Sequence, residues 1–171
     1  DANTTANNNI AIGYHTMVAN TTGLNNVAVG VEALDANTTG NNNVALGINA
    51  LSANTTAEAN TAVGTNALMV NTTGTQNVAV GQGVLDANTT ANNNSALGYN
   101  AMTSNTTGAS NVAMGTSALQ LNTTGANNTA VGFDAGSSIT TGGHNVCLGR
   151  RAGEDITTGQ YNVCIAGDQA A

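Results

Sequence analysis

Residues 37–53 read N-T-T-G-N-N-N-V-A-L-G-I-N-A-L-S-A, and close copies of this 17-residue unit follow one another along the whole chain. The tripeptide Asn-Thr-Thr begins at Asn3 and recurs every 17 residues as far as Asn122. The register continues in residues 139–141 and 156–158, which both read I-T-T. Self-similarity at a fixed period is the signature of a repeat architecture. We therefore describe the chain as ten copies with positions 1 to 17, counted from the Asn of Asn-Thr-Thr.

The copies separate fixed positions from variable ones. Positions 2 and 3 are always Thr, position 9 is Ala or Cys, and position 11 is Gly in nine copies. Position 7 is always Asn, and stacked amides can bond to their own copies above and below. We predict such a ladder for Asn9, Asn26, Asn43, Asn60, Asn77, Asn94, Asn111, Asn128, Asn145 and Asn162.

The unit is too short for a pair of helices, because helical repeats need 30 or more residues. Residues 77–81 (N-V-A-V-G) instead indicate a short strand closed by glycine, and Gly at position 11 indicates a positive φ. We expect a second extended segment to run from the Ala-Leu pair of positions 14 and 15 into the next Asn-Thr-Thr. The sequence thus predicts an all-β fold, a parallel β-solenoid of ten 17-residue coils about 4.8 Å apart.

The composition agrees with stacked coils. The 171 residues include 29 Asn and 27 Thr but no Pro and only 6% charged residues, against about 5% Pro and about 25% charge in ordinary domains. Proline would remove a donor from the ladder between coils, and a charge at a fixed position would stack like charges along the rod. Two Arg and no Lys leave no basic surface, so we expect no nucleic-acid partner. No apolar run approaches about 20 residues, so we expect no membrane insertion.

The strand motif also suggests an interface. Side chains alternate between faces along a strand, and we expect the large residues at positions 8 and 10 to point into the coil. Position 9 would then point outward, and its uniformly small residues would pack against sister chains. This predicts a homotrimer, the alternative being a monomer in which coil curvature selects the small residue. The predicted interface consists of Ala28, Ala45, Ala62, Ala79, Ala96, Ala113, Ala130, Cys147 and Cys164.

The strand motif resembles the head repeats of YadA-like trimeric autotransporter adhesins. It reads N-V-A-V-G in residues 77–81, N-V-A-L-G in 43–47, N-T-A-V-G in 60–64 and N-I-A-I-G in 9–13. The resemblance implies a trimer of left-handed parallel β-rolls that serves in surface attachment, although the units of those heads are usually shorter. The complete unit is also similar to repeats of phage and algal-virus tail-fibre-like proteins, which often precede a self-cleaving chaperone domain of the S74 type.

The last copies depart from the consensus. Ile replaces Asn at position 1 (Ile139, Ile156), Gly replaces Leu at position 15 (Gly136, Gly153), and the register slips by one residue at 166–167. The terminal repeats of a repeat protein usually depart from the consensus. We therefore divide the chain into a regular solenoid, residues 1–138, and divergent terminal coils, residues 139–171, that lead to a cap or a further domain. Because the chain begins inside the pattern and without Met, we interpret it as a segment of a longer protein.

Few residues are candidates for chemistry. His15 and His144 lie in distant copies without a recurring acidic partner, and catalysis needs several groups in one place. We expect no enzymatic activity, no cofactor and no metal site. Cys147 and Cys164 are one repeat apart and should stack on adjacent coils. Packed thiols are the favoured state, and a disulfide or a metal site with His144 are the alternatives.

The Asn-Thr-Thr motifs allow two further interpretations. Each is formally an N-glycosylation sequon, but glycans about 4.8 Å apart would collide, so ladder stacking is favoured. Files of Thr on a solenoid can also order water, which makes ice binding an alternative function. We expect a structural shaft of an extracellular, cell-surface or virion fibre that presents an attachment surface to a host or surface receptor. A homopolymeric extracellular filament is a third possibility.

Overall fold

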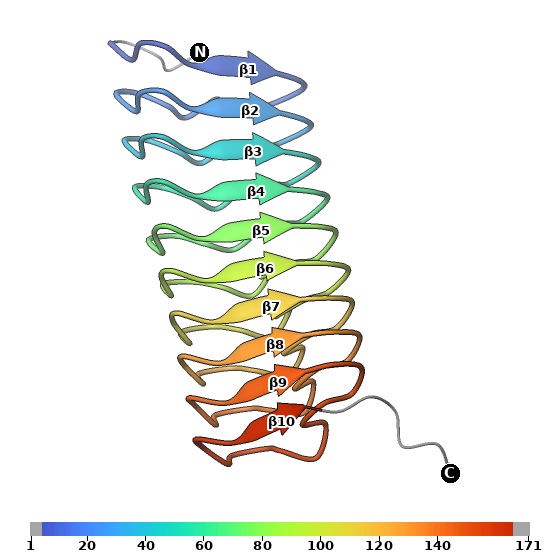
Figure 1. Cartoon of the computed structure of the whole chain (residues 1–171). Coiled ribbons are helices and arrows are strands. Elements are labelled where there is room, and N and C mark those ends of the chain that lie inside the picture. The colour runs from blue at the N-terminus through green and yellow to red at the C-terminus, as the bar shows by residue number, and fades with distance from the viewer. Residues whose placement is uncertain (1–4, 166–171) are drawn as a thin grey trace.

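The computed structural model describes residues 5–165, which form a single stack of coils with one strand in each coil (Figure 1). The ten strands make one parallel sheet in sequence order. They are β1 (Ile10–Ile12), β2 (Val27–Val29), β3 (Val44–Leu46), β4 (Thr61–Val63), β5 (Val78–Val80), β6 (Ser95–Leu97), β7 (Val112–Met114), β8 (Thr129–Val131), β9 (Val146–Leu148) and β10 (Val163–Ile165). The predicted parallel β-solenoid is confirmed.

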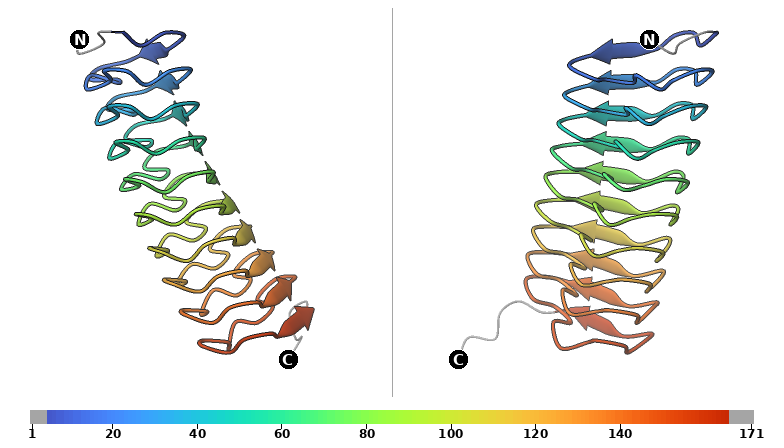
Figure 2. Two further views of the ribbon diagram at one scale, coloured as in Figure 1. Left: turned by 90° about the vertical axis from the view of Figure 1, so that its left-hand side faces the viewer. Right: turned by 180° about the vertical axis from the view of Figure 1, so that it is seen from behind.

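The register between strands is the 17-residue period. Ile10 pairs with Val27 at one end of the sheet, and Val146 pairs with Val163 at the other. In Figure 1 each strand crosses the front from left to right, and the chain returns behind it to begin the next coil below. This is a left-handed winding, and the view from behind shows the same path (Figure 2).

The second extended segment that the sequence suggested does not form. In each complete coil the residues after the strand make turns, and positions 13 and 15 have left-handed backbone angles, as at Asn49 (φ 55°) and Leu51 (φ 53°). Residues with left-handed backbone angles at every second position cannot make an extended strand. The prediction of two straight segments in each coil was wrong, because the coil closes through tight turns.

Backbone hydrogen bonds nevertheless join successive coils well beyond the strands. The amide of Leu51 donates to the carbonyl oxygen of Ala67 (3.0 Å), and the amide of Ala53 donates to that of Met69 (3.0 Å). At position 11, Gly47 has φ 140°, and a Cβ there would lie 2.5 Å from the oxygen of Gly64. Glycine is therefore required both by the backbone angle and by the close approach of the next coil.

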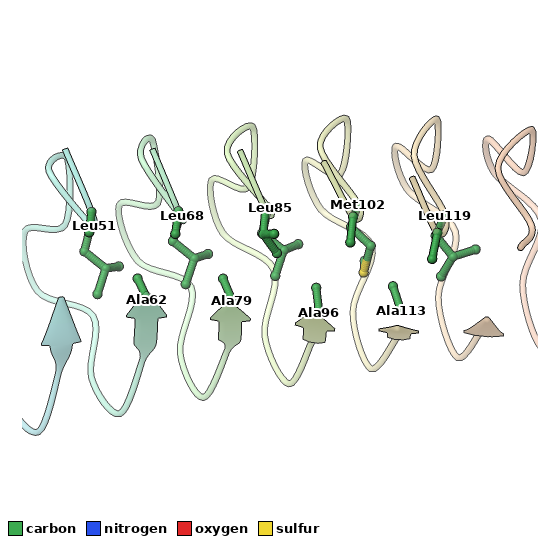
Figure 3. Packing of buried hydrophobic residues seen from close by; sticks show 14 of the residues in the cluster. Leu51, Ala62, Leu68, Ala79, Leu85, Ala96, Met102, Ala113 and Leu119 are labelled. Carbon is green, nitrogen blue, oxygen red and sulfur yellow. The ribbon is translucent and has the colours of Figure 1, made fainter. Parts of the chain in front are cut away.

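A narrow core runs along the inside of the coils. It consists mainly of Ala at positions 9 and 14 and Leu or Met at position 15. In Figure 3 the side chains of Ala62 and Ala79 point from the strands toward the turns that carry Leu51 and Leu68. All four are fully buried. The core is thus one Leu layer facing one Ala layer.

Two asparagine ladders flank this core and are themselves buried. At position 7, Asn43 Nδ2 donates to the oxygen of Ala57 (2.9 Å), while its Oδ1 accepts from the backbone amide of Asn60 (3.0 Å). At position 1, Asn54 Nδ2 donates to Asn37 Oδ1 (2.9 Å) and to the oxygen of Ala57 (3.2 Å). Position 7 asparagines are joined coil to coil from Asn9 to Asn162, but the Oδ1 of each accepts from the backbone amide of the next, whereas the sequence suggested bonds between side-chain amides. The ladder thus satisfies backbone groups at a turn, outside the strands.

Candidate functional site

The predicted interface residues lie inside the coil and not on its surface. Ala28, Ala45, Ala62, Ala79, Ala96, Ala113, Ala130 and Cys147 are buried in the core, and the half-buried Cys164 packs against it. A three-residue strand projects its middle side chain to one face and its two outer side chains to the other. Where Leu or Met of position 15 fills the thin coil from the opposite wall, only the methyl group of Ala fits at position 9, and the larger Cys147 faces Gly136 and Gly153, where position 15 is Gly. The assignment of position 9 to an intermolecular interface was wrong.

The residues predicted for the core instead lie on the outside of the coil, where they are half-buried or exposed. Position 10 includes Leu97, which is 49% exposed, and Met114, which is 44% exposed. We call the side chains of positions 8 and 10 from β2 to β9 the outer face. It comprises Val27, Val29, Val44, Leu46, Thr61, Val63, Val78, Val80, Ser95, Leu97, Val112, Met114, Thr129, Val131, Val146 and Leu148. None of these residues is charged.

Position 12 widens this apolar surface beside the strand ends. Ile48, Tyr99 and Phe133 are each about half exposed there. The Arg150 guanidinium lies 5.8 Å from the centre of the Phe133 ring and brings the first basic group to this edge. Large contiguous apolar patches on the surface of a soluble protein mark interaction sites. The outer face is the strongest candidate for a functional surface.

The side-chain amides of the Asn-Thr-Thr motifs from Asn20 to Asn122 are not available to glycans in the folded coil. Asn37 Nδ2 donates to both Asn20 Oδ1 (2.8 Å) and the oxygen of Gly40 (3.1 Å), and Asn37 is fully buried. A glycan on Nδ2 would replace one of these hydrogen bonds and place a sugar in the core. The favoured interpretation of these motifs as ladder residues agrees with these contacts.

The two threonines of the motif play different parts. At position 2, Thr38 Oγ1 donates to the oxygen of Thr55 in the next coil (3.1 Å), and this pattern recurs along the stack. The position 3 residues from Thr5 to Thr158 are exposed in every coil. A single file of exposed Thr therefore runs along the rod, one residue for each coil.

The two cysteines stack inside the end of the core. Cys147 and Cys164 are paired in β9 and β10, and both are free thiols. Burial raises the pKa of the Cys147 thiol to about 11, and the neighbouring Cys164 adds to the shift. The structure thus has packed thiols, as favoured from the sequence, and a neutral thiol of this kind is a poor nucleophile.

The histidines lie on the surface in different coils. The His144 ring stacks on Tyr161 of the next coil, with 4.8 Å between ring centres, and His15 stacks on Tyr14. Within residues 5–165, no group of three or more His, Cys, Asp or Glu residues could hold a metal ion. An ion pair in the divergent coils joins Arg151 and Glu154, with 3.6 Å between Nε and Oε2.

The divergent coils keep the architecture of the regular ones. Strands β8, β9 and β10 pair in the same register as the others, and Ile139 is fully buried at position 1. The register slip at 166–167 lies outside the described residues. The same part of the chain, 5–165, has no helix long and apolar enough to cross a membrane.

Comparisons of the chain with protein-family profiles, with curated proteins and with solved structures gave no match. The resemblance to adhesin heads and tail-fibre-like repeats therefore stays a prediction.

Proposed function

We propose that this solenoid is a stiff shaft segment of an extracellular or virion fibre and that three copies associate side by side through their outer faces. The observation that carries the proposal is the uncharged apolar strip along one side of an unbroken sheet. Because identical positions stack about 4.8 Å apart, the eight coils from β2 to β9 present this strip over about 38 Å. The role of the shaft is mechanical, because the shaft holds an attachment surface at a distance.

The physical argument favours a closed assembly of parallel copies. Strand side chains of Val, Leu and Met that are half exposed in one chain gain stability when a second apolar face covers them. A closed cyclic arrangement covers the strip of every copy and leaves no open face for further growth. The resemblance to trimeric adhesin heads favours three copies over two. The coil-to-coil hydrogen bonds then supply stiffness along the axis of the fibre.

Light scattering tests this proposal directly. The chain has a mass of 16.8 kDa, so the trimer is expected at about three times that value. Leu97 on the outer face and Leu121 at position 17 are both 49% exposed, which makes a matched pair of substitutions. We expect Leu97→Glu to give monomers, because it places like charges together in an apolar interface, and Leu121→Glu to leave the trimer intact.

Circular dichroism of both variants should show the same sheet content. A parent chain that stays monomeric at every concentration would overturn the proposal, as would equal masses for the two Glu variants. Polymers whose length grows with concentration would favour the homopolymeric filament instead.

Ice binding is a second candidate, and the observation in its favour is the file of exposed threonines at position 3. Against it, the position 2 hydroxyls donate to the next coil and so are committed within the protein. Thermal hysteresis of the purified segment separates the two candidates. Measurable thermal hysteresis that Thr90→Val lowers would support ice binding, and the absence of thermal hysteresis would exclude it.

A further inference from the structure

The chain contains two classes of N-glycosylation sequon that the fold treats differently. Eight are the Asn-Thr-Thr motifs at position 1. Two others occur at position 6, as Asn93-Asn94-Ser95 and Asn127-Asn128-Thr129. A sequon marks an acceptor only where a glycan can be carried on the surface, so the burial of each asparagine decides its use.

The position 1 asparagines cannot carry a glycan in the folded coil. Asn88, which lies nearest to the first position 6 sequon, is typical of them. Its Nδ2 donates to Asn71 Oδ1 (2.8 Å) and to the oxygen of Ala91 (3.2 Å), and the residue is fully buried. Among the described residues the same holds from Asn20 to Asn122, whereas Asn3 lies outside the described range.

The position 6 asparagines are exposed. Asn93 and Asn127 have φ of 62° and 59°, and their backbone amides donate to the previous coil, at Thr75 (3.1 Å) and Ala109 (3.1 Å). The backbone therefore stays anchored whatever the side chain carries. A left-handed conformation suits Asn, and both side chains lie in solvent at the corner that precedes the strand.

Their neighbours in the stack also leave these two side chains without an amide ladder of their own kind. In the first coils, position 6 holds Asn8, Asn25 and Asn42, whose amides bond to one another. Asn93 and Asn127 instead lie on either side of Ser110. They are two coils, about 9.6 Å, apart, so two glycans are less crowded than glycans on consecutive coils would be.

We propose that Asn93 and Asn127 are N-glycan acceptor sites of this chain and that the buried Asn-Thr-Thr motifs from Asn20 to Asn122 stay unmodified in the folded protein. The proposal rests on the extracellular route of the proposed function. In the transfer, Nδ2 of Asn attacks the anomeric carbon of a lipid-pyrophosphate-linked oligosaccharide. The anomeric C–O bond breaks, the lipid pyrophosphate leaves with the electron pair, and Nδ2 loses one proton. The hydroxyl that each sequon requires belongs to Ser95 or Thr129.

Expression in a eukaryotic secretory host tests the assignment. The secreted protein is treated with peptide N-glycosidase in heavy-oxygen water, and peptide mass spectrometry then identifies each former glycan site as a labelled Asp. We expect label at Asn93 and Asn127 and none at the Asn-Thr-Thr motifs from Asn20 to Asn122. Ser95→Val and Thr129→Val should each remove one site, and both restore the Val that position 8 carries in most coils, as at Val78.

A gain-of-site variant provides the matched control. Ala59 occupies the same corner with φ 58° and is exposed, and Ala59→Asn creates a third position 6 sequon because Asn60 and Thr61 follow it. We expect a third glycan on that variant. Secreted wild-type protein that is bare at both sites, or that carries label at Asn88 or Asn105, would overturn the proposal. The light-scattering mass of unglycosylated protein tests the shaft separately, so the two failures are distinguishable.

Discussion

The contents of two core positions are exchanged where the regular solenoid passes into the divergent coils, and this exchange yields a quantitative prediction. Regular coils place Leu at position 15 and Asn at the following position 1, whereas here Gly136 is followed by Ile139. A Cβ on Gly136 would lie 3.1 Å from Cδ1 of Ile139 and 3.1 Å from Cδ2 of Leu119. The Ile side chain thus occupies the space that Leu fills in earlier coils.

The exchange also interrupts the position 1 ladder. In regular coils each Oδ1 accepts from the Nδ2 of the next Asn, as Asn105 accepts from Asn122 (2.9 Å). The side chain of Ile139 has no donor for this bond. Asn122 Oδ1 is consequently buried with no hydrogen-bond partner. A buried acceptor without a partner costs about 1–3 kcal/mol.

Two single substitutions, both made in a Cys147→Ala background, should each destabilise the protein. The background is needed because the Cys147 sulfur lies 3.5 Å from the Cβ site of Gly136. Ile139→Asn removes a buried aliphatic group at a cost of about 2–5 kcal/mol, partly offset by the restored ladder bond, for a net loss of about 2 kcal/mol. Gly136→Leu overpacks against Ile139 and Leu119 and should cost about 2 kcal/mol.

The double variant should be as stable as its Cys147→Ala parent or more so. The leucine introduced by Gly136→Leu would fill the space that the isoleucine side chain vacates. The backbone already suits it, because Gly136 has φ 57° and Leu119 at the same position has φ 50°. The asparagine introduced by Ile139→Asn would donate to the unpartnered oxygen of Asn122. The two single losses of about 2 kcal/mol then disappear together, which corresponds to a coupling energy of about 4 kcal/mol, above the roughly 0.5–3 kcal/mol that is usual for contacting residues.

Native-state amide hydrogen exchange is the appropriate assay, because repeat proteins can open locally rather than unfold in one step. The opening free energies of Thr129–Val131 and Val146–Leu148 are compared across the four proteins of the cycle. A control pair combines Gly136→Leu with the distant, exposed Thr90→Ala and should be additive. Additivity of the central pair within about 0.5 kcal/mol would refute the exchange argument.

Three further predictions concern the buried ladder, the core and the thiol. Asn94→Asp should destabilise the protein by about 3 kcal/mol at pH 7 and by less at pH 4. The reason is that burial raises the folded-state pKa of the new carboxyl, so stability is lost as pH rises through that value. The exposed control, Thr90→Ala, should cost under about 0.5 kcal/mol. Urea denaturation at both pH values measures this, and an unchanged pH dependence would contradict it. Ala79→Leu should lower the urea midpoint by overpacking a closed core, while Val78→Leu on the outer face should leave the midpoint unchanged. Equal urea midpoints for these two variants would be inconsistent with the burial of Ala79. Because the pKa of Cys147 is raised to about 11, iodoacetamide at pH 8 should leave this thiol unmodified until the protein is denatured. The stability of the folded protein should also fall as pH rises from about 9 toward 11. Rapid alkylation of the native thiol, seen by mass spectrometry, would refute the prediction of a protected thiol.

The register, the strand and the buried ladder could be predicted from the sequence because each depends on stacking alone. A strict period places Asn60 directly on Asn43, whatever the shape of the coil, and the shared amide chemistry then fixes the hydrogen bonds. The absence of Pro and the constant Gly at position 11 follow from the same contacts between coils. Stacking determines which residues meet, and it leaves open which way they point.

The direction of the strand side chains could not be predicted, because a three-residue strand has no long alternation to compare with a core. The pattern Val-Ala-Val suggests that the large residues are inside, yet Ala79 is buried and Val78 is 41% exposed. The deciding fact is the opposite wall of the coil, where Leu85 enters the core from a left-handed residue (φ 53°). A bulky residue rarely adopts a left-handed backbone conformation, so a consensus Leu at position 15 does not indicate one.

The last copies of the repeat do indicate the left-handed conformation at position 15. At position 15 the regular residue is Leu or Met, and it becomes Gly136 and Gly153, both with positive φ. Glycine in place of a core Leu indicates a backbone angle that glycine adopts without strain, and the accompanying Ile139 shows that the lost volume is replaced from the next position. Both substitutions together point to a Leu that reaches inward through a left-handed turn. Once position 15 fills the coil, position 9 must be the small residue facing it, and the outward direction of positions 8 and 10 follows.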